Sequence, residues 1–164
     1  MSRGRRRAAT FGAAILACVI ALTAAARGPA AVTLAHDLAS DAREARESRR
    51  VVVVLFSTAG CPWCERVREE YLKPILANPV DAARVVVREI DIDGRDALTD
   101  FTGTATTHAA FAAHHKVRFV PTVMILGPGG EQLAAPLVGF TTADYYGYFL
   151  DERIAEGLAK LNGR

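Results

Sequence analysis

The sequence predicts an α/β protein in which a central mixed sheet of about four strands is flanked by helices, in the order αβαβαββα. The first observation behind this prediction is the continuous apolar run over residues 51–56 (VVVVLF), which is typical of a strand buried on both faces. The second is that further strand-like runs, over residues 84–92, 122–126 and 132–138, are separated by segments with helical periodicity or turn signals.

One helix is expected before the strand at residues 51–56 in the sequence, and another after it. The apolar stripe of the first helix consists of Leu34, Leu38, Ala42 and Ala45. The stripe of the second helix consists of Cys64, Val67, Tyr71 and Ile75. Pro74 is expected to kink or end this second helix, because proline lacks the N–H that a helix interior requires.

The middle of the chain is expected to hold a strand, a loop and a short helix. The strand covers residues 84–92, and its end is marked by Asp91, Asp93 and Gly94. Residues 95–106 are expected to form a loop. Thr107 is a suitable N-cap for a short helix that extends through Lys116.

A hairpin and a long helix are expected to complete the fold. The strands at residues 122–126 and 132–138 are joined by Gly127-Pro128-Gly129-Gly130, which is a strong turn signal. The residues expected at the start of the last helix are Thr141 or Thr142 as the N-cap and Asp144 in the first turn.

The motif Cys61-Pro62-Trp63-Cys64 lies at the junction between the strand at residues 51–56 and the following helix. If Cys61 is the N-cap and Pro62 the first helical residue, the unpaired N–H groups and the dipole of the helix favour a thiolate on Cys61. Such a pair can lower the pKa of the first thiol from about 8.5 to between about 3.5 and 7.5. Cys61 is therefore the expected nucleophile. Cys64, one turn further in, is the expected resolving thiol.

Two other interpretations of this motif are a zinc site and a structural disulfide. A structural zinc site usually has a second pair of ligands, whereas the remaining candidates here are scattered: Cys18, His36, His108, His114 and His115. We therefore expect no metal, and no cofactor other than the redox-active disulfide. A purely structural disulfide stays open as an alternative, although a loop this short constrains the unfolded chain only weakly.

The N-terminus has the pattern of an export signal. Four arginines (Arg3, Arg5, Arg6 and Arg7) precede an uncharged apolar run over residues 8–26 that ends in small residues. We expect a signal peptide over residues 1–26, with an end at residue 35 as the alternative, and one domain over residues 32–164. The run is also long enough for an uncleaved membrane anchor. Cys18 falls within this segment, so one cysteine pair remains in an exported domain, where disulfides persist.

The charge pattern of the chain argues against nucleic-acid binding. The formal net charge is +2, and this value includes the arginines of the signal segment. No basic stripe interleaved with aromatic residues occurs along the sequence, and such a stripe is the electrostatic signature of nucleic-acid binding. We therefore expect proteins, not nucleic acids, as partners.

The chain resembles the thioredoxin superfamily. The resemblance rests on the Cys61–Cys64 motif, on Val120-Pro121-Thr122 at the start of a strand, on the glycine-rich hairpin turn and on Gly139. It implies a thioredoxin-like fold with a cis peptide bond between Val120 and Pro121. The backbone of Val120 would then lie beside the thiols and pair with an extended substrate strand. From the residues alone, an ordinary trans proline at the start of a strand is the alternative.

Within the superfamily, the chain resembles exported single-domain bacterial proteins, some of them linked to sulfur oxidation. The resemblance rests on Asp100-Phe101-x-Gly103 and Asp144-Tyr145-Tyr146-Gly147, and it implies a periplasmic location. The chain departs from the wider pattern at Leu55, where thioredoxins carry a buried acid six residues before the first active-site cysteine. Glu65 is a candidate to replace that acid. Trp63 is expected to be exposed on the rim of the active site.

We therefore expect an exported thiol-disulfide oxidoreductase that reduces disulfides of exported proteins through Cys61 and Cys64. A reductase in an oxidising compartment needs electrons from across the membrane, so an integral-membrane thiol carrier is the expected donor. The domain is expected to be a monomer. The alternatives are a dithiol oxidase, a copper-binding or chaperone-like module in which the two thiolates hold a soft ion, and an inert adaptor with the same fold.

Overall fold

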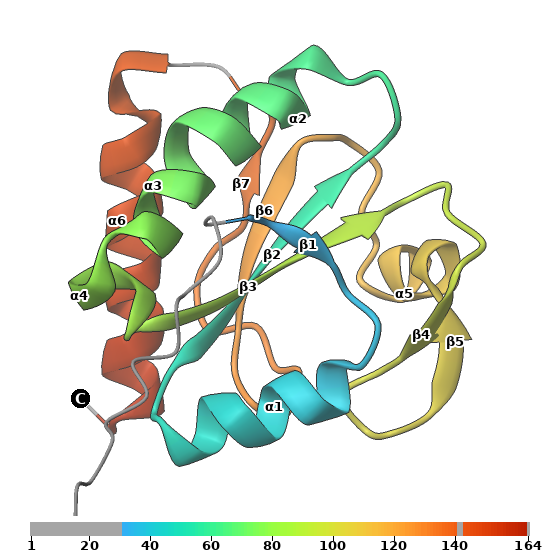
Figure 1. Ribbon diagram of the computed structural model, residues 1–164, viewed down its shortest axis with the longest axis horizontal. Helices are drawn as coiled ribbons and strands as arrows, with labels where there is room; N and C mark the ends of the chain where they lie inside the picture. The colour runs from blue at the N-terminus through green and yellow to red at the C-terminus, as the bar shows by residue number, and fades with distance from the viewer. Residues whose placement is uncertain (1–30, 141–142, 164) are drawn as a thin grey trace, which may run out of the picture.

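Five strands form a mixed sheet at the centre of the protein (Figure 1). The computed structural model describes residues 31–140 and 143–163. In sheet order the strands are β1 (Thr33–Leu34), β3 (Val85–Asp91), β2 (Val51–Ser57), β6 (Thr122–Leu126) and β7 (Leu137–Val138). The first three are parallel to one another, whereas β6 is antiparallel to β2 and β7 is antiparallel to β6. The mixed sheet expected from the sequence is therefore present, with β1 as an additional strand.

The central strand β2 is buried along its whole length. Side chains of a strand alternate between the two faces of a sheet, so each face receives half of this apolar run. One half packs with the helical segment after Cys61 and with α6 (Ala143–Leu161), and the other half packs with α1 (Leu38–Glu47) and α5 (His108–His114). The sheet therefore has a core on each face, as the unbroken apolar pattern predicts.

The helical segment after Cys61 continues past Pro74. It consists of α2 (Pro62–Arg66), a π-helical stretch η1 (Val67–Leu72) and α3 (Lys73–Ala77), and α4 (Pro79–Ala82) follows. The N–H of Lys73, directly before the proline, bonds to the carbonyl of Arg68, five residues back. The sequence predicted a kink or an end at Pro74, and the end does not occur. The wider π turns precede the proline, whose ring crowds the carbonyl four residues back in a regular α-helix.

The first helix begins later than its apolar stripe suggested. Asp37 is the N-cap of α1, and its carboxylate accepts from the N–H of Ser40 at 2.8 Å. Leu34 was expected in this helix, but it belongs to β1 and is 39% exposed. The reason is the free edge of β3: Leu34 is the register partner of Glu89, and the N–H of Ala35 bonds to the Glu89 carbonyl.

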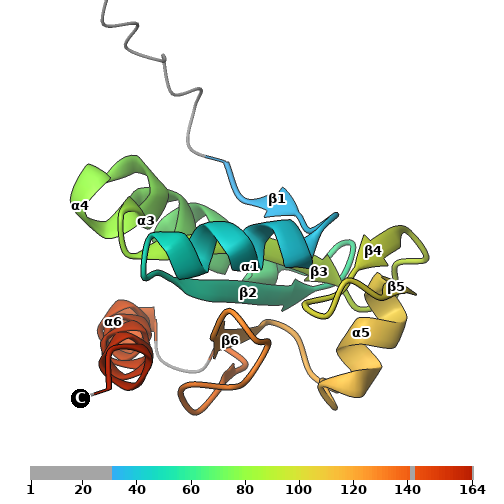
Figure 2. The ribbon, with the colours of Figure 1, turned by 90° about the horizontal axis from the view of Figure 1, so that it is seen from below.

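The loop expected at residues 95–106 was a wrong prediction. Its residues contribute to two short antiparallel strands, β4 (Ala97–Thr99) and β5 (Ala105–Thr107). The turn between them is held by Asp100, whose carboxylate accepts from the N–H groups of Thr102 and Thr104. In Figure 2 this small sheet lies beside α5, at the end of the molecule away from α6. Thr107 caps α5 as predicted, by accepting from the N–H of Ala110, although α5 ends at His114 and not at Lys116.

The hairpin is present, but its second strand is shorter than predicted. Gln132 forms an isolated bridge with Leu126, and regular pairing resumes only in β7. Pro136, which has no N–H to donate, lies between these two points. Helix α6 follows with Asp144 in its first turn, as predicted.

Several expectations fall on residues that the structure does not describe. They are the signal or anchor segment at residues 1–26, Cys18 within it, and the choice of cap between Thr141 and Thr142. Within residues 31–140 and 143–163, no helix combines the length and the apolar character that crossing a membrane requires.

Candidate active site

Cys61 and Cys64 form a disulfide at the start of α2. Their sulfur atoms are 2.16 Å apart and their Cα atoms 5.3 Å apart. Cys61 is the N-cap of α2, and its sulfur accepts from the N–H of Cys64 at 3.1 Å. Pro62 takes the first helical position, where its missing N–H has no intrahelical partner to lose. The first sulfur therefore lies at the positive end of the helix, where a thiolate is stabilised.

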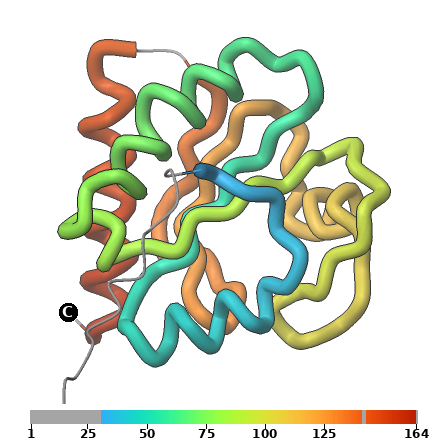
Figure 3. Tube along the Cα trace, viewed as in Figure 1, coloured from blue at the N-terminus to red at the C-terminus, as the bar shows by residue number. Residues whose placement is uncertain are grey.

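The turn before Cys61 positions this sulfur. Chain direction reverses between the end of β2 and α2, as the trace in Figure 3 shows. Gly60 has φ +71°, a backbone conformation that residues with a Cβ rarely adopt. The hydroxyl of Thr58 donates to the carboxylate of Asp93 at 2.6 Å, and the N–H of Cys61 bonds to the carbonyl of Thr58. The turn is thus tied to the segment that follows β3.

The two cysteines differ in their access to solvent. Cys64, within α2, is completely buried, whereas Cys61 is partly exposed. Between them, Pro62 is exposed and Trp63 is 51% exposed. A protein disulfide approaching from outside would therefore meet Cys61 and not Cys64.

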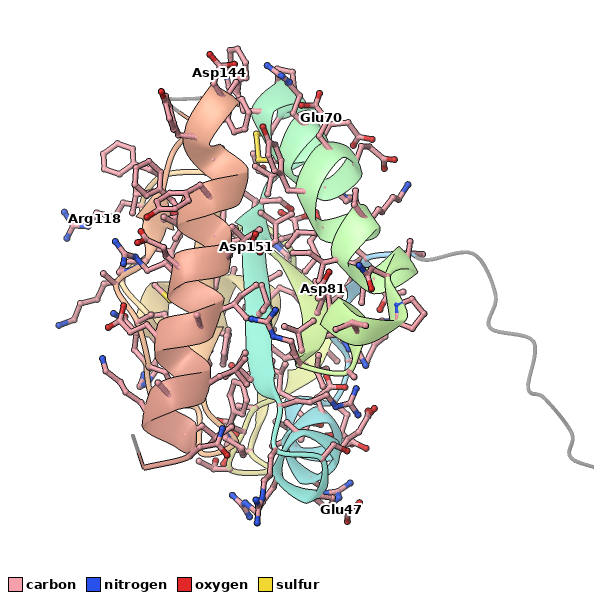
Figure 4. The ribbon with its side chains drawn as sticks, turned by 90° about the vertical axis from the view of Figure 1, so that its left-hand side faces the viewer. Glu47, Glu70, Asp81, Arg118, Asp144 and Asp151 are labelled. Carbon is pink, nitrogen blue, oxygen red and sulfur yellow. A yellow bond between two sulfur atoms is a disulfide. The ribbon has the colours of Figure 1, made fainter. Side chains whose placement is uncertain are left out.

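Trp63 belongs to an aromatic stack at the rim of the disulfide. Its indole ring lies 5.7 Å from the ring of Phe140, with the planes 20° apart. The guanidinium of Arg66 lies 4.8 Å from the Phe140 ring and is itself held by two 2.9 Å bonds to Glu70. Figure 4 shows the yellow disulfide between the start of α6, near Asp144, and the helix that carries Glu70. The rings of Tyr71 and Tyr146 pack against Phe140 in turn.

The bond between Val120 and Pro121 is cis, as the resemblance implied. Pro121 is buried, and Val120 is half-buried. Thr122, which begins β6, is the register partner of Phe56 near the end of β2. Because the two strands are antiparallel, the start of β6 and the end of β2 lie at the same edge of the sheet. Val120 and Pro121 therefore lie at the edge from which the chain turns into Cys61.

Leu55 is buried in β2, and its register partner on β3 is the buried acid Glu89. The guanidinium of Arg68 donates two hydrogen bonds to Glu89, and these bonds raise the pKa of Arg68. Glu65 is exposed on the helix, where it pairs with Arg68. Glu89 was not among the site residues predicted from the sequence, although an acid within the apolar run of β3 is a signal for a buried functional group.

Two histidines that the sequence offered as scattered metal-ligand candidates lie together at the end of the short helix. His114 ends α5 and His115 is its C-cap residue. Burial, and then the proximity of His114, lower the pKa of His115. Across the described part of the chain, no group of three His, Cys, Asp or Glu side chains is arranged to hold a metal ion.

Comparisons with known proteins agree with this architecture. Residues 38–153 match a thioredoxin-like domain family. Three solved structures are similar in fold: a thioredoxin from Malassezia sympodialis (17% identity, 81% of this chain and 96% of that chain, TM-score 0.53), a mutant of poplar thioredoxin h (18%, 79% and 86%, 0.51), and mitochondrial thioredoxin 3 of Saccharomyces cerevisiae in its oxidized form (17%, 76% and 94%, 0.50). A search of curated proteins found no match.

The similar structures show the fold, whereas the family match shows membership in a family. At these identities the solved structures show the fold alone, which is the thioredoxin-like fold. The fold together with a cysteine pair at disulfide distance supports thiol-disulfide oxidoreductase chemistry. Because the family match covers most of the chain, from α1 to within α6, this protein is a member of the thioredoxin-like domain family.

Proposed function

We propose that the protein is an exported thiol-disulfide oxidoreductase that reduces disulfides of exported proteins in the periplasm. The observation that carries the proposal is the position of Cys61 as the N-cap of α2, with its sulfur accepting the N–H of Cys64. The same backbone donor that meets the sulfur of the disulfide is available to a thiolate in the reduced protein. A thiolate at this position is the species that attacks a disulfide.

In the proposed reaction, the Cys61 thiolate attacks one sulfur of a substrate disulfide. A mixed disulfide forms, and the second substrate sulfur leaves as a thiolate that takes up a proton. Cys64, as a thiolate, then attacks the Cys61 sulfur and releases the first substrate sulfur. Two electrons have passed to the substrate, and the Cys61–Cys64 disulfide remains. The complete burial of Cys64 and the partial exposure of Cys61 favour this order of events.

Val120 and Trp63 are the proposed contacts for the substrate chain. Val120 precedes a cis proline at the end of the sheet next to the active-site turn, and this position supports a role for its backbone in pairing with an extended segment. The half-exposed ring of Trp63 offers an apolar surface beside the disulfide.

The direction of electron flow rests on two features. Neither residue between the cysteines is a histidine that would stabilise the Cys61 thiolate further, and a single domain, which we expect to be a monomer, would be a poor isomerase. Each turnover as a reductase leaves the protein oxidised. We therefore propose an integral-membrane thiol carrier as the donor that reduces the disulfide again.

The reduction potential, measured by equilibration with glutathione, tests the direction. A value well below about −200 mV, in the range of reducing dithiol proteins, supports a reductase, whereas a value above about −150 mV overturns that direction and indicates a dithiol oxidase. Tight stoichiometric copper binding by the reduced protein, without reduction of insulin, would favour a metal-binding module instead.

Trapping of substrates tests the proposed roles of the cysteines. Cys64→Ser should hold mixed disulfides on Cys61, because the resolving thiol is missing. The matched control is Cys61→Ser, which keeps the fold but should trap nothing. Full function in vivo of the double Cys61→Ser, Cys64→Ser variant would show an adaptor instead of an enzyme.

Fractionation and N-terminal sequencing of the mature protein would distinguish cleavage near residue 26 or 35 from an uncleaved anchor.

A further inference from the structure

A buried ion pair lies beneath the helical segment that carries the cysteines. Glu89 of β3 is 6% exposed, in a strand that is otherwise mainly apolar. Its side chain shares a sheet face with Val85 and Val87, which pack against η1 and α6. One carboxylate oxygen accepts from Nε of Arg68 at 2.8 Å, and the other accepts from Nη2 of Arg68 at 2.5 Å and from the hydroxyl of buried Ser57.

Arg68 connects this pair to the active site. It follows Cys64 by four residues, and residues spaced in this way are neighbours on a helix surface. The side chain of Arg68 is 21% exposed, and it contacts Glu65 on its outer side in addition to Glu89 on its inner side. The guanidinium is therefore held between the sheet and the helix, and its residue lies about one helical turn after Cys64.

We propose that Arg68 and Glu89 are positioning residues for the dithiol. Glu89 holds the guanidinium of Arg68 beside the reduced sulfur atoms and neutralises its charge. This inference rests on the redox function proposed above and identifies the ion pair that adjusts the reduction potential of the dithiol. Glu89 does not act as a free proton acceptor, because both of its oxygens are occupied by hydrogen bonds.

The physical basis is the opposite effect of the two charges on a thiolate. A cation near a thiolate stabilises it, whereas an anion destabilises it, and both effects are strong where water is excluded. With the pair intact, the two effects largely cancel. Removal of one partner leaves the charge of the other uncompensated. The two single substitutions should therefore shift the reduction potential of the dithiol in opposite directions.

Other charged groups around the site lie closer to solvent. On the helix these include Glu65, Arg66 and Glu70; beside the active-site turn they are Asp91 and Asp93, and at the start of α6 it is Asp144. All of them are exposed or half-exposed. Among the residues that the structure describes, the buried acids are Glu89 and Asp41.

Asp41 supplies a matched control. It lies on α1, against the opposite face of the sheet, where it accepts two bonds from Arg88 at 2.6 and 3.0 Å. Arg88 is the neighbour of Glu89 on β3. The two ion pairs therefore share chemistry, geometry and burial, but only one of them underlies the active-site helix.

The experiment compares Glu89→Gln, Arg68→Met and Asp41→Asn by equilibration with glutathione, and by thiolate absorbance as a function of pH. Glu89→Gln should favour the reduced form and shift the equilibrium constant by about tenfold, equal to about +30 mV. Arg68→Met should shift the constant in the opposite direction by a similar factor. Asp41→Asn should change it less than about twofold, which is roughly 9 mV, whatever its effect on stability.

The outcomes that overturn the inference differ from those that overturn the proposed function. Shifts of Glu89→Gln and Arg68→Met in the same direction would show that the pair only supports the fold, and so would an equal shift in Asp41→Asn. If Glu89→Gln fails to fold, Arg68→Met and Arg68→Lys decide the question, because the lysine keeps the charge and should retain most of the wild-type potential. The proposed function is judged separately, from the potential of the wild-type protein and from trapping by Cys64→Ser.

Discussion

The indole ring of Trp63 stacks on the ring of Phe140, so one of the two residues between the cysteines is held by a side chain from the far end of the hairpin. Phe140 follows β7 and directly precedes the segment that leads into α6. The guanidinium of Arg66 lies against the ring of Phe140 as well. The active-site rim is thus assembled from parts of the chain that are more than seventy residues apart in the sequence.

Phe140→Ala should raise KM more for protein disulfides than for small disulfides. An aromatic pair contributes about 0.5–1.5 kcal/mol beyond burial. Without the stack, Trp63 loses its fixed orientation, and KM for a protein disulfide should rise by about three- to tenfold while kcat changes less. Steady-state kinetics with a protein disulfide and with a small aromatic disulfide would measure this difference.

The matched control for Phe140 is Tyr148→Ala. Tyr148 is 60% exposed on α6, and its hydroxyl bonds to Glu152 of the same helix. This variant should leave both reactions unchanged. An equal loss with the small disulfide in Phe140→Ala would contradict a role of the stack in substrate contact.

His108→Leu should destabilise the fold without changing the chemistry of the cysteines. The imidazole is 1% exposed; its Nδ1 accepts from the N–H of Asp91 at 3.1 Å, and its Nε2 donates to the carbonyl of Ala35 at 2.8 Å. Substitution by leucine leaves the buried carbonyl of Ala35 and the part-buried N–H of Asp91 without these partners, at a cost of about 2–4 kcal/mol in the free energy of unfolding. Urea denaturation would measure the loss. A reduction potential that moved together with stability would contradict a purely structural role.

The core of the fold could be predicted because its signals are local. The unbroken apolar run of β2 implied burial on both faces, and the cysteine motif after it implied a helix start with Cys61 as the cap. The cis bond at Pro121 is different, because the sequence alone left it open and only the resemblance implied it.

The errors concern features that depend on distant partners. Leu34 has helical spacing to Leu38, but the free edge of β3 draws it into β1. The missed pairing of β4 with β5 is the exception, because it depends on a local turn in which the Asp100 carboxylate accepts from Thr102 and Thr104. Trp63 was expected on the rim, but its partner Phe140 could not be identified from spacing. Glu89 was missed because its partner lies twenty-one residues away on a helix.

Asp100→Asn should destabilise the β4–β5 turn at neutral pH and have little effect in acid. The hydroxyl of Thr102, followed by the N–H groups of Thr104 and Thr102, holds the pKa of Asp100 below its ordinary value. A carboxylate with a lowered pKa in the folded state stabilises the fold above its unfolded pKa of about 3.9, and this contribution disappears as the pH falls through the lower folded pKa. Denaturant unfolding of both proteins between neutral and strongly acidic pH would measure the difference. A difference that stayed constant over this range would contradict the assignment.

Two glycines of α6 should respond to alanine with opposite signs. In a helix interior, alanine is favoured over glycine by about 0.8–1.0 kcal/mol. At Gly147, an added Cβ would lie 3.5 Å from the ring of Tyr71, which is an ordinary contact, so Gly147→Ala should stabilise the protein by about 0.5–1 kcal/mol. At Gly157, the Cβ would lie 2.6 Å from Cγ2 of Ile125 and 3.3 Å from Cγ1 of Val51. Overpacking of this kind costs about 1–3 kcal/mol, which exceeds the gain in helix propensity, so Gly157→Ala should lower the free energy of unfolding. Denaturation curves for the two variants settle the comparison, and a stabilised Gly157→Ala would mean that α6 can move away from the sheet at little cost.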